Sequence, residues 1–417
     1  MPLPSSDTTP PRNALTTAAT WCAIAMGFSL PISTAASNIL LVAVVVLFAL
    51  SADYKRKFQA VVSNPVAMAC AAFCTLTLLG CLYGRGNPAD KLHYLGKYLT
   101  LLAVPLLVPL FAERAARIRA LFSFCAAMLL TLGLSFLIRF GWLPAFLKPL
   151  MATPNPLVHV PDAVVFKLSI THGFLMAFTA FLLAIGARQT ESLRARWTLA
   201  VLAALAAYNV LFMVIGRTGY VVLAALCVYF LFRRFGRRGI VLAAIGVLLV
   251  AAASYQWSES FRQRAGEVVA EGRAWKQGRG DPTSIGLRFD YYSNTLSIVR
   301  DRPLFGVGIG GFEQAYGERI KGTGMAPSNN PHNQYLLIAA QLGLLGLACL
   351  LWLYAQVWRG AGRLDPPFGE IARGLLLAIV IGNLFNSFML DFTERTFFAW
   401  LSGVLFAGWS SRNIQCA

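Results

Sequence analysis

Residues 335–357 read YLLIAAQLGLLGLACLLWLYAQV, a run in which no side chain is charged. About 20 apolar residues in a helix are enough to cross the hydrocarbon core of a bilayer, so this run predicts a membrane-spanning helix. The whole chain has the same character, because 57% of its residues are apolar and 13% are charged. A soluble domain carries about 25% charged residues. The sequence therefore excludes a soluble protein and predicts an integral membrane protein.

Comparable apolar runs recur along all 417 residues. Including the first, they lie near 15–33, 37–51, 65–83, 98–112, 119–140, 171–187, 197–215, 218–232, 239–256, 335–357, 371–390 and 396–410. The predicted fold is an all-α polytopic membrane protein with about 12 transmembrane helices. The run near 15–33 follows a polar tail that lacks a basic region and a small-residue cleavage site, so we expect a retained helix.

The charge of the chain is strongly positive, with 36 Lys and Arg against 18 Asp and Glu and a formal net charge of +18. In membrane proteins, short loops rich in Lys and Arg stay in the cytoplasm. With a cytoplasmic N-terminus, the inner connections and termini carry 18 of the 36 basic residues: Arg12, Lys55, Arg56, Lys57, Arg114, Arg117, Arg119, Arg188, Arg194, Arg196, Arg233, Arg234, Arg237, Arg238, Arg359, Arg363, Arg373 and Arg412. We therefore expect both termini in the cytoplasm. Charges in short connections beside spans also argue against nucleic-acid binding.

One polar segment is long, at about 257–333, and it lies outside between the ninth and tenth predicted spans. The chain thus divides into residues 1–256 with nine spans, an outer catalytic loop at 257–333, and residues 334–417 with three spans. Two apolar stripes at helical spacing predict amphipathic helices in the loop: Trp257, Phe261, Ala265, Val268, Val269 and Trp275, then Ile285, Phe289, Tyr292, Leu296 and Val299. Arg302-Pro303 and a glycine cluster, Gly306, Gly308, Gly310 and Gly311, end the second helix and allow a tight turn back to the spans.

His332 is the first candidate catalytic residue. It follows Asn330-Pro331, where Asn330 is a suitable N-cap and Pro331 suits the first helical position, so we expect His332 in the first turn of the next helix. The positive potential there disfavours the imidazolium, which would leave a neutral general base. The alternative is an interfacial histidine that only hydrogen-bonds the loop.

Arg217 and Arg288 are the candidate anion-binding residues. Arg217 lies in Gly216–Tyr220, which interrupts two apolar runs at the outer surface, and Arg288 lies on the second predicted loop helix. Two arginines beside a helix N-terminus suit a phosphate-bearing lipid headgroup. The alternatives are a snorkelling interfacial arginine for Arg217 and a charge on a solvated helix face for Arg288.

Four further residues are candidates for lining the same site. Tyr220 and Asn333 adjoin the candidate residues in sequence, and His172 begins the sixth span. Asp391 lies with Glu394 and Arg395 in a short outer turn, where a local ion pair is the alternative. No His, Cys or carboxylate set has the spacing of a metal site, and no Walker motif occurs. We therefore expect neither a metal nor a cofactor.

Taken together, these features resemble the bacterial O-antigen ligase and polymerase superfamily. The resemblance rests on the number of spans, the single late outer loop, Gly216–Tyr220, and the run from Arg288 through Asp301-Arg302-Pro303-Leu304-Phe305-Gly306-Val307-Gly308 to Pro331-His332-Asn333. Length and the lack of an added soluble domain look most like the O-antigen ligases of Gram-negative inner membranes.

The resemblance implies a GT-C-like glycosyltransferase that works on the periplasmic face of the inner membrane. Such ligases move polysaccharide from undecaprenyl diphosphate onto a sugar of the lipid A-core, without metal or nucleotide. His332 matches the essential histidine of the family, and Arg217 and Arg288 match the arginines that hold the diphosphate. The alternatives are an O-antigen polymerase and a protein O-oligosaccharyltransferase, which use the same donor, and a secondary transporter or flippase. We see no matching halves of the kind that transporters show.

Overall fold

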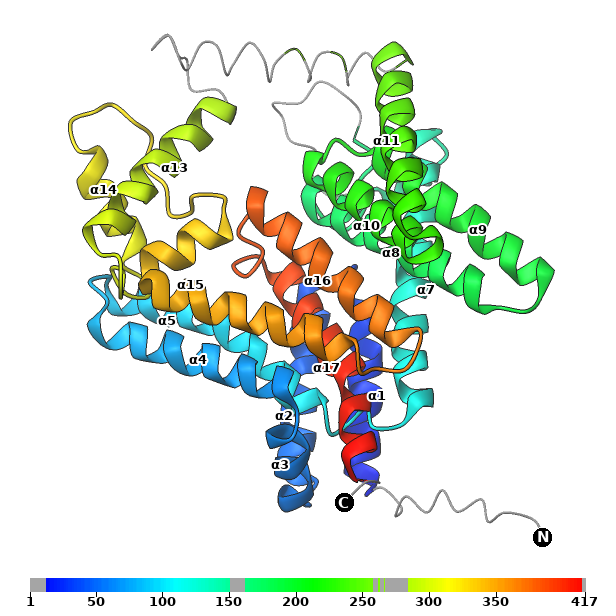
Figure 1. Ribbon diagram of the computed structural model, residues 1–417, viewed down its shortest axis with the longest axis horizontal. Helices are drawn as coiled ribbons and strands as arrows, with labels where there is room; N and C mark the ends of the chain where they lie inside the picture. The colour runs from blue at the N-terminus through cyan, green and yellow to red at the C-terminus, as the bar shows by residue number, and fades with distance from the viewer. Residues whose placement is uncertain (1–12, 151–161, 258–261, 263–265, 267–283, 415–417) are drawn as a thin grey trace.

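The computed structural model describes residues 13–150, 162–257, 262, 266 and 284–414. All regular structure in these ranges is helical (Figure 1). The elements are α1 (Ala14–Ser29), α2 (Thr34–Leu50), α3 (Tyr54–Val62), α4 (Pro65–Tyr83), α5 (Pro88–Leu99), η1 (Thr100–Leu102), α6 (Ala103–Leu107), α7 (Arg114–Arg139), η2 (Ala145–Leu150), α8 (Ser169–Gln189), α9 (Leu193–Tyr208), η3 (Asn209–Met213), α10 (Arg217–Phe235), α11 (Arg237–Trp257), α13 (Ser284–Asp301), α14 (Phe312–Ile320), α15 (Gln334–Ala361), α16 (Phe368–Phe385) and α17 (Phe392–Ile414).

The described helices confirm a polytopic all-α membrane protein. Seven are long and apolar enough to cross a membrane, namely α4, α7, α8, α9 with η3, α10, α15 and α16. An eighth is added if α2 and α3, which bend by 118° at their junction, count as one span. Helices α1, α11 and α17 cover three more of the predicted runs, and their crossing of the membrane stays a prediction.

The prediction of one continuous span near 98–112 is wrong. That stretch is divided among the end of α5, η1, α6 and the turns after it. Pro105 lies within α6 and Pro109 follows it. Each proline lacks an amide hydrogen and clashes with the preceding turn, so an apolar run that contains both does not continue as one helix.

Helix α17 lies at the centre of the bundle, between α16 and the α1–α7 pair (Figure 1). Its Phe397 and Trp400 are fully buried, and the indole nitrogen of Trp400 donates a 2.8 Å hydrogen bond to the Ala23 carbonyl of α1. The ring centroid of Phe397 lies 4.8 Å from that of Phe124 of α7, in a tilted arrangement, and 5.3 Å from that of Phe178 of α8, edge to face. Aromatic packing around α17 therefore holds the amino-terminal and carboxy-terminal helices together.

Two arginines that the charge pattern placed in different inner connections meet at one carboxylate, at one end of the bundle. Arg188 at the end of α8 forms an ion pair with Glu370 at the start of α16. Arg233 near the end of α10 binds the same carboxylate at 3.3 Å. Because Arg217 begins α10 and Arg233 lies 16 residues further, these two arginines are about 24 Å apart along the helix. Arg188 and Arg233 thus lie at one end of the bundle, and Arg217 lies at the opposite end of α10.

Helix α15 is broken at Gly343, where the backbone turns to φ 66° and ψ −165°. The segment that follows α13 fills the break. Val307 and Gly308 each donate a 2.8 Å hydrogen bond, to the carbonyls of Ala340 and Gln341 respectively. In return, the amides of Leu344 and Leu345 donate to the carbonyls of Pro303 and Leu304 at 2.7 and 3.4 Å. Non-helical backbone inside a membrane bundle is tolerated only when its polar groups are paired in this way.

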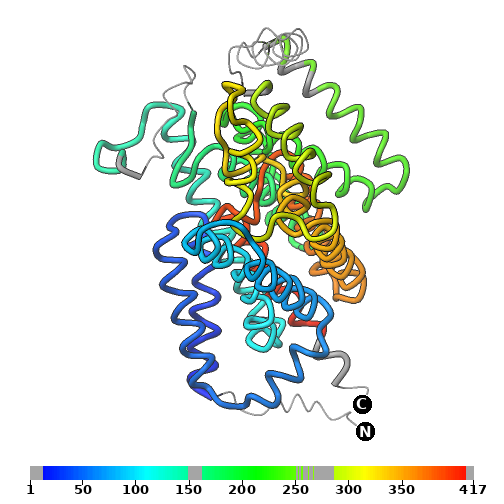
Figure 2. Tube along the Cα trace, turned by 90° about the vertical axis from the view of Figure 1, so that its left-hand side faces the viewer, coloured from blue at the N-terminus to red at the C-terminus, as the bar shows by residue number. Residues whose placement is uncertain are grey.

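The other side of the inserted segment contacts the end of α4 and the loop after it. Ile309 donates a 3.0 Å hydrogen bond to the Gly80 carbonyl, and Arg85 donates one of 3.3 Å to Val307. A Cβ on Gly308, whose φ is +84°, would lie 2.1 Å from the Cα of Gly84. The expected glycine turn therefore does return the chain to the spans, and it lies between α4 and α15 (Figure 2).

Candidate functional site

Helix α13 carries Arg288 and packs along α15. The apolar stripe predicted for this helix is not its buried face. Phe289 and Leu296 of the stripe are exposed, whereas Thr295 and Ile298, which lie outside the stripe, are buried. The side chain of Ile285 lies outside the described residues, as does the first predicted amphipathic helix beyond Trp257. Arg288 itself is half-buried, on the flank between the exposed and buried faces.

The sequence predicted His332 in the first turn of α15, and this prediction is wrong. Asn333 is the N-cap, and its side-chain oxygen accepts 3.0 Å hydrogen bonds from the amides of Tyr335 and Leu336. The Asn330 oxygen instead accepts from the His332 amide at 2.9 Å and from the Ser387 hydroxyl at 2.7 Å. His332 precedes the cap and has a φ of 53°, a left-handed conformation that is costly for a residue with a side chain.

The imidazole of His332 is half-buried beside α13. Its ring centroid lies 5.9 Å from that of Tyr291, and the Tyr292 hydroxyl donates to the His332 carbonyl at 3.4 Å and to the Leu384 carbonyl at 3.2 Å. Burial lowers the pKa of His332 below its ordinary value, and the positive charge of Arg288 lowers this pKa further. The neutral form expected from the sequence is therefore favoured by burial and by Arg288 rather than by the helix terminus.

Arg217 is the first residue of α10 and follows the non-helical residues 214–216. Gly216 allows close packing there, because a Cβ would lie 2.5 Å from the Ser169 carbonyl oxygen. The hydroxyl of Tyr220 donates a 2.8 Å hydrogen bond to the Val214 carbonyl, and Asn386 donates one of 2.8 Å to the Thr218 hydroxyl. The start of α10 is thereby held against both α8 and the residues after α16.

Arg217 and His332 each lie within electrostatic range of Arg288, although the three residues lie on different elements. Burial lowers the pKa of Arg288; Tyr292 raises this pKa, and the positive charge of Arg217 lowers it. Arg288 is thus electrostatically linked both to Arg217 and to His332. Two guanidinium groups beside a neutral imidazole can bind a doubly charged anion while the imidazole accepts a proton.

Asn333 and Tyr220 support this site through the backbone. Besides capping α15, Asn333 donates a 3.1 Å hydrogen bond from its amide nitrogen to the Leu384 carbonyl. His172 lies elsewhere, buried in α8, where its Nε2 is 3.0 Å from the Asn209 side-chain oxygen and its Nδ1 accepts from the Val165 amide at 3.5 Å. Both ring nitrogens of His172 are therefore used inside the bundle rather than beside His332.

Asp391 immediately precedes α17, in a separate group of charges. Burial raises the pKa of its carboxyl, while the positive charges of Lys97 and Arg395 lower it. Arg395 also donates hydrogen bonds to Thr100 at 3.2 Å and to the Leu390 carbonyl at 2.5 Å. Lys97 and Arg395 thus provide the opposite charges for Asp391 that a local ion-pair interpretation requires.

Residues 384–387, which accept or donate four of the hydrogen bonds described above, were not among the predicted site residues. They belong to the predicted span at 371–390, whereas α16 ends at Phe385. The signal was present as Asn383, Asn386 and Ser387, three polar residues within an apolar run. Among the described residues, no group of three His, Cys, Asp or Glu side chains is arranged to hold a metal ion.

An all-helical polytopic bundle with a histidine and two arginines at one end is consistent with a membrane enzyme of the glycosyltransferase-like class. The family model described as O-Antigen ligase matches residues 202–351, and this segment contains Arg217, Arg288 and His332. These residues therefore carry the domain of the O-antigen ligase and polymerase superfamily. The chain is also similar to an uncharacterized protein of Haemophilus influenzae, with 24% identity over 188 residues, 43% of this chain and 46% of that protein. The match covers about half of that relative.

Proposed function

We propose that the protein is an O-antigen ligase that transfers polysaccharide from undecaprenyl diphosphate to a sugar hydroxyl of the lipid A-core. The proposal is supported by the match of residues 202–351 to the O-antigen ligase family and by the electrostatic effects of Arg217 on Arg288 and of Arg288 on His332 inside that segment. A diphosphate is the anion that two adjacent guanidinium groups suit, and a sugar hydroxyl needs the base that a neutral histidine supplies.

In the proposed mechanism, Arg217 and Arg288 bind the diphosphate of the donor. Their hydrogen bonds strengthen as the bond between the anomeric carbon and the phosphate oxygen breaks, because negative charge then gathers on the leaving group. His332 removes the proton of the acceptor hydroxyl, which contributes about 10²- to 10⁴-fold to the rate. The mechanism assigns no carboxylate as nucleophile, so we propose a single displacement with inversion at the anomeric carbon. Transfer is proposed to proceed without a metal.

The distribution of charge supports a periplasmic active site in the Gram-negative inner membrane. Arg188 and Arg233, which gather around Glu370, belong to the connections that the positive-inside rule assigns to the cytoplasm. Arg217 lies about 24 Å from Arg233 along α10, a distance comparable to the thickness of the hydrocarbon core. The site is therefore proposed to face the periplasm, with both termini in the cytoplasm.

The decisive experiment is transfer by the purified full-length protein from an undecaprenyl-diphosphate glycan. Three acceptors are offered separately: lipid A-core, a second molecule of the donor, and a pilin. Product on lipid A-core alone supports the ligase, whereas product on the second donor or on the pilin replaces it with a polymerase or a protein glycosyltransferase. Movement of intact donor across proteoliposomes without any transfer would instead indicate a transporter. The variant Arg300→Gln, which removes an exposed charge of α13, is the control.

The stereochemistry of the product is tested separately. The configuration of the new glycosidic bond is read by NMR and compared with that of the donor. Inversion is expected for a single displacement. Retention would require a covalent intermediate or a different arrangement of the reacting groups, and it would contradict this mechanism while leaving the transfer activity intact.

A further inference from the structure

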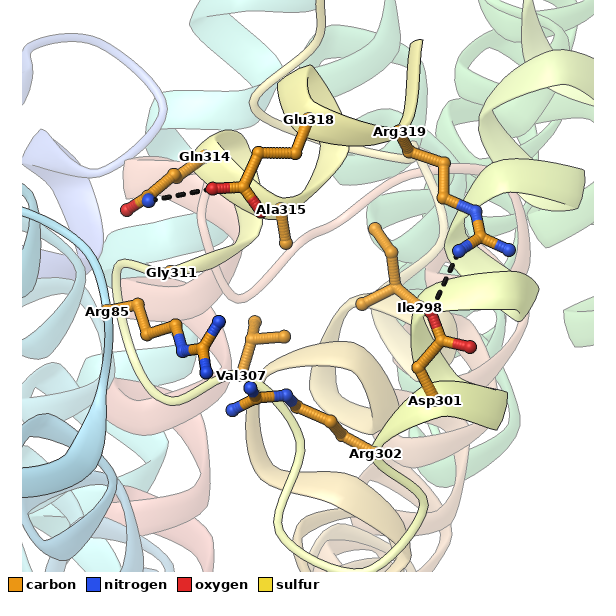
Figure 3. A pocket seen from close by; sticks show the side chains of 10 residues that line it. All are labelled: Arg85, Ile298, Asp301, Arg302, Val307, Gly311, Gln314, Ala315, Glu318 and Arg319. Atoms are coloured by element: carbon orange, nitrogen blue, oxygen red, sulfur yellow. Dashed lines mark hydrogen bonds and ion pairs between the residues drawn. The ribbon is translucent and has the colours of Figure 1, made fainter. Parts of the chain in front are cut away.

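A cleft of about 470 Å³ lies where the end of α13 meets α14 and the loop after α4 (Figure 3). Three arginines, two acids and a glutamine supply its charged and polar lining: Arg85, Arg302, Arg319, Asp301, Glu318 and Gln314. Arg217, Arg288 and His332 do not line it. Ten residues of α13 separate Arg288 from Ile298 at the cleft, a distance of about 15 Å along the helix.

The two acids of the cleft already have partners. Arg319 binds the Asp301 carboxylate at 2.8 Å, and the Gln314 amide donates to Glu318 at 2.9 Å. Within the described ranges, neither Arg85 nor Arg302 has an ion pair with an acidic residue. Figure 3 shows the guanidinium groups of these two arginines pointing toward one another beside Val307. The two acids of the cleft are bonded to Arg319 and Gln314, so the converging charges of Arg85 and Arg302 create a binding position for an anion.

Both arginines extend from backbone that is fixed by the insertion into α15. The Arg85 amide donates to the Val307 carbonyl at 3.3 Å, and the Arg302 carbonyl accepts from the Gly306 amide at 3.1 Å. The close contact between Gly84 and Gly308 holds the two segments together. The side chains of Arg85 and Arg302 therefore start from fixed positions on opposite walls, as a prearranged anion site requires.

We propose that this cleft binds a phosphoryl group carried on a sugar, with Arg85 and Arg302 as its ligands. A planar guanidinium can offer two parallel hydrogen bonds to phosphate oxygens. The volume of the cleft is in the range of small-molecule sites and leaves room for a sugar ring beside the phosphoryl group. This role rests on the proposed function: the cleft holds a phosphorylated part of the glycolipid acceptor while a more distant sugar hydroxyl reaches His332.

The binding test uses the full-length protein in detergent and measures dissociation constants for glucose monophosphate, glucose, inorganic phosphate and glycerophosphoglycerol. Glucose monophosphate is expected to bind best, and the variants Arg85→Gln and Arg302→Gln should each weaken it about tenfold. Arg300→Gln, on the same helix but outside the cleft, should bind like the wild type. Equal binding of inorganic phosphate would identify a free phosphate site, and stronger binding of glycerophosphoglycerol would identify a phospholipid site. Either result, or unchanged binding by both variants, overturns the proposal.

The transfer test compares the native acceptor with the same acceptor after phosphatase treatment. For the wild type, dephosphorylation should raise the acceptor KM about tenfold with little change in kcat or in the donor KM. Arg85→Gln and Arg302→Gln should lose this discrimination, because their site no longer reads the phosphoryl group. Discrimination that persists in both variants contradicts the proposal. Absence of any transfer refutes the proposed function, whereas the binding test still decides the role of the cleft.

Discussion

The break in α15 provides the sharpest structural prediction, through the substitution Gly343→Ala. A Cβ at this position would lie 2.1 Å from the carbonyl oxygen of Leu304, 2.2 Å from its carbon and 2.5 Å from the nitrogen of Phe305. The obstacle is backbone, so no side chain can rotate away. The φ of 66° and ψ of −165° also belong to a region that glycine alone adopts easily.

Two costs combine in this variant. Forcing a residue with a Cβ into the backbone conformation of Gly343 costs about 1–3 kcal/mol. Displacing the inserted segment breaks the hydrogen bonds from Leu344 and Leu345, and each amide left unpaired away from water costs about 1–3 kcal/mol. Even at the lower end of both ranges, the substitution should reduce the free energy of unfolding by about 3 kcal/mol.

The free energy of unfolding is measured by SDS titration in mixed micelles, with circular dichroism as the readout. Gly133→Ala is the matched control, because this glycine lies in α7 and a Cβ there would have nothing within 4 Å. The control should leave stability unchanged or raise it by about 0.5–1 kcal/mol, since alanine is the better helix former. If Gly343→Ala loses less than about 1 kcal/mol relative to Gly133→Ala, the break in α15 does not have the proposed structural role.

Four predictions concern the site. His332→Ala should lower the transfer rate by about 10²-fold or more while the donor dissociation constant stays within about twofold. The rate is measured by single-turnover kinetics and the dissociation constant by donor binding. An equal loss of rate and donor affinity would make His332 a binding or structural residue. Arg288→Lys keeps a positive charge but lacks the planar fork, so kcat/KM should fall about tenfold, and wild-type turnover would exclude the bidentate role. Burial and the Arg288 charge lower the pKa of His332, so kcat/KM should fall only below about pH 6.5. This acid limb should move to higher pH in Arg288→Gln, which lacks the charge, but not in Arg288→Lys. Coincident pH profiles for all three proteins would exclude the Arg288 effect. A chelator should leave turnover unchanged, and activity that is lost with it and restored by a divalent cation would show a metal requirement.

Much of the bundle follows from apolar length. The predicted runs at 65–83 and 171–187 correspond to α4 and α8 because a long uncharged segment in a bilayer must satisfy its backbone within a helix. The charge pattern also placed Arg188 and Arg233 on one side of the membrane, where the structure joins both to Glu370. The spans depend on local composition, and the side on which the arginines lie depends on the positive-inside rule.

Contacts between distant segments could not be predicted in the same way. Asn330 and Asn333 are equally good caps by residue type. In the structure the Asn330 oxygen bonds His332 and the distant Ser387, and Asn333 caps α15. Gly343 lies in an apolar run that predicts one continuous helix, because no charged residue or proline near it indicates a break for the inserted segment. The electrostatic link between Arg217 and Arg288 likewise requires α10 and α13 to be placed in space.

The order of the contacts around the inserted segment has a consequence for how the protein is made. The loop after α4, with Gly84, leaves the ribosome first, the segment 303–308 follows, and α15 comes last. The loop after α4 is therefore already synthesised when the segment 303–308 packs on it, and that segment is already synthesised when α15 packs on it. Before docking, α15 can enter the bilayer as a continuous apolar helix. Opening the helix at Gly343 would then follow its insertion, and the amides of Leu344 and Leu345 would exchange bonds within the helix for bonds to the carbonyls of Pro303 and Leu304.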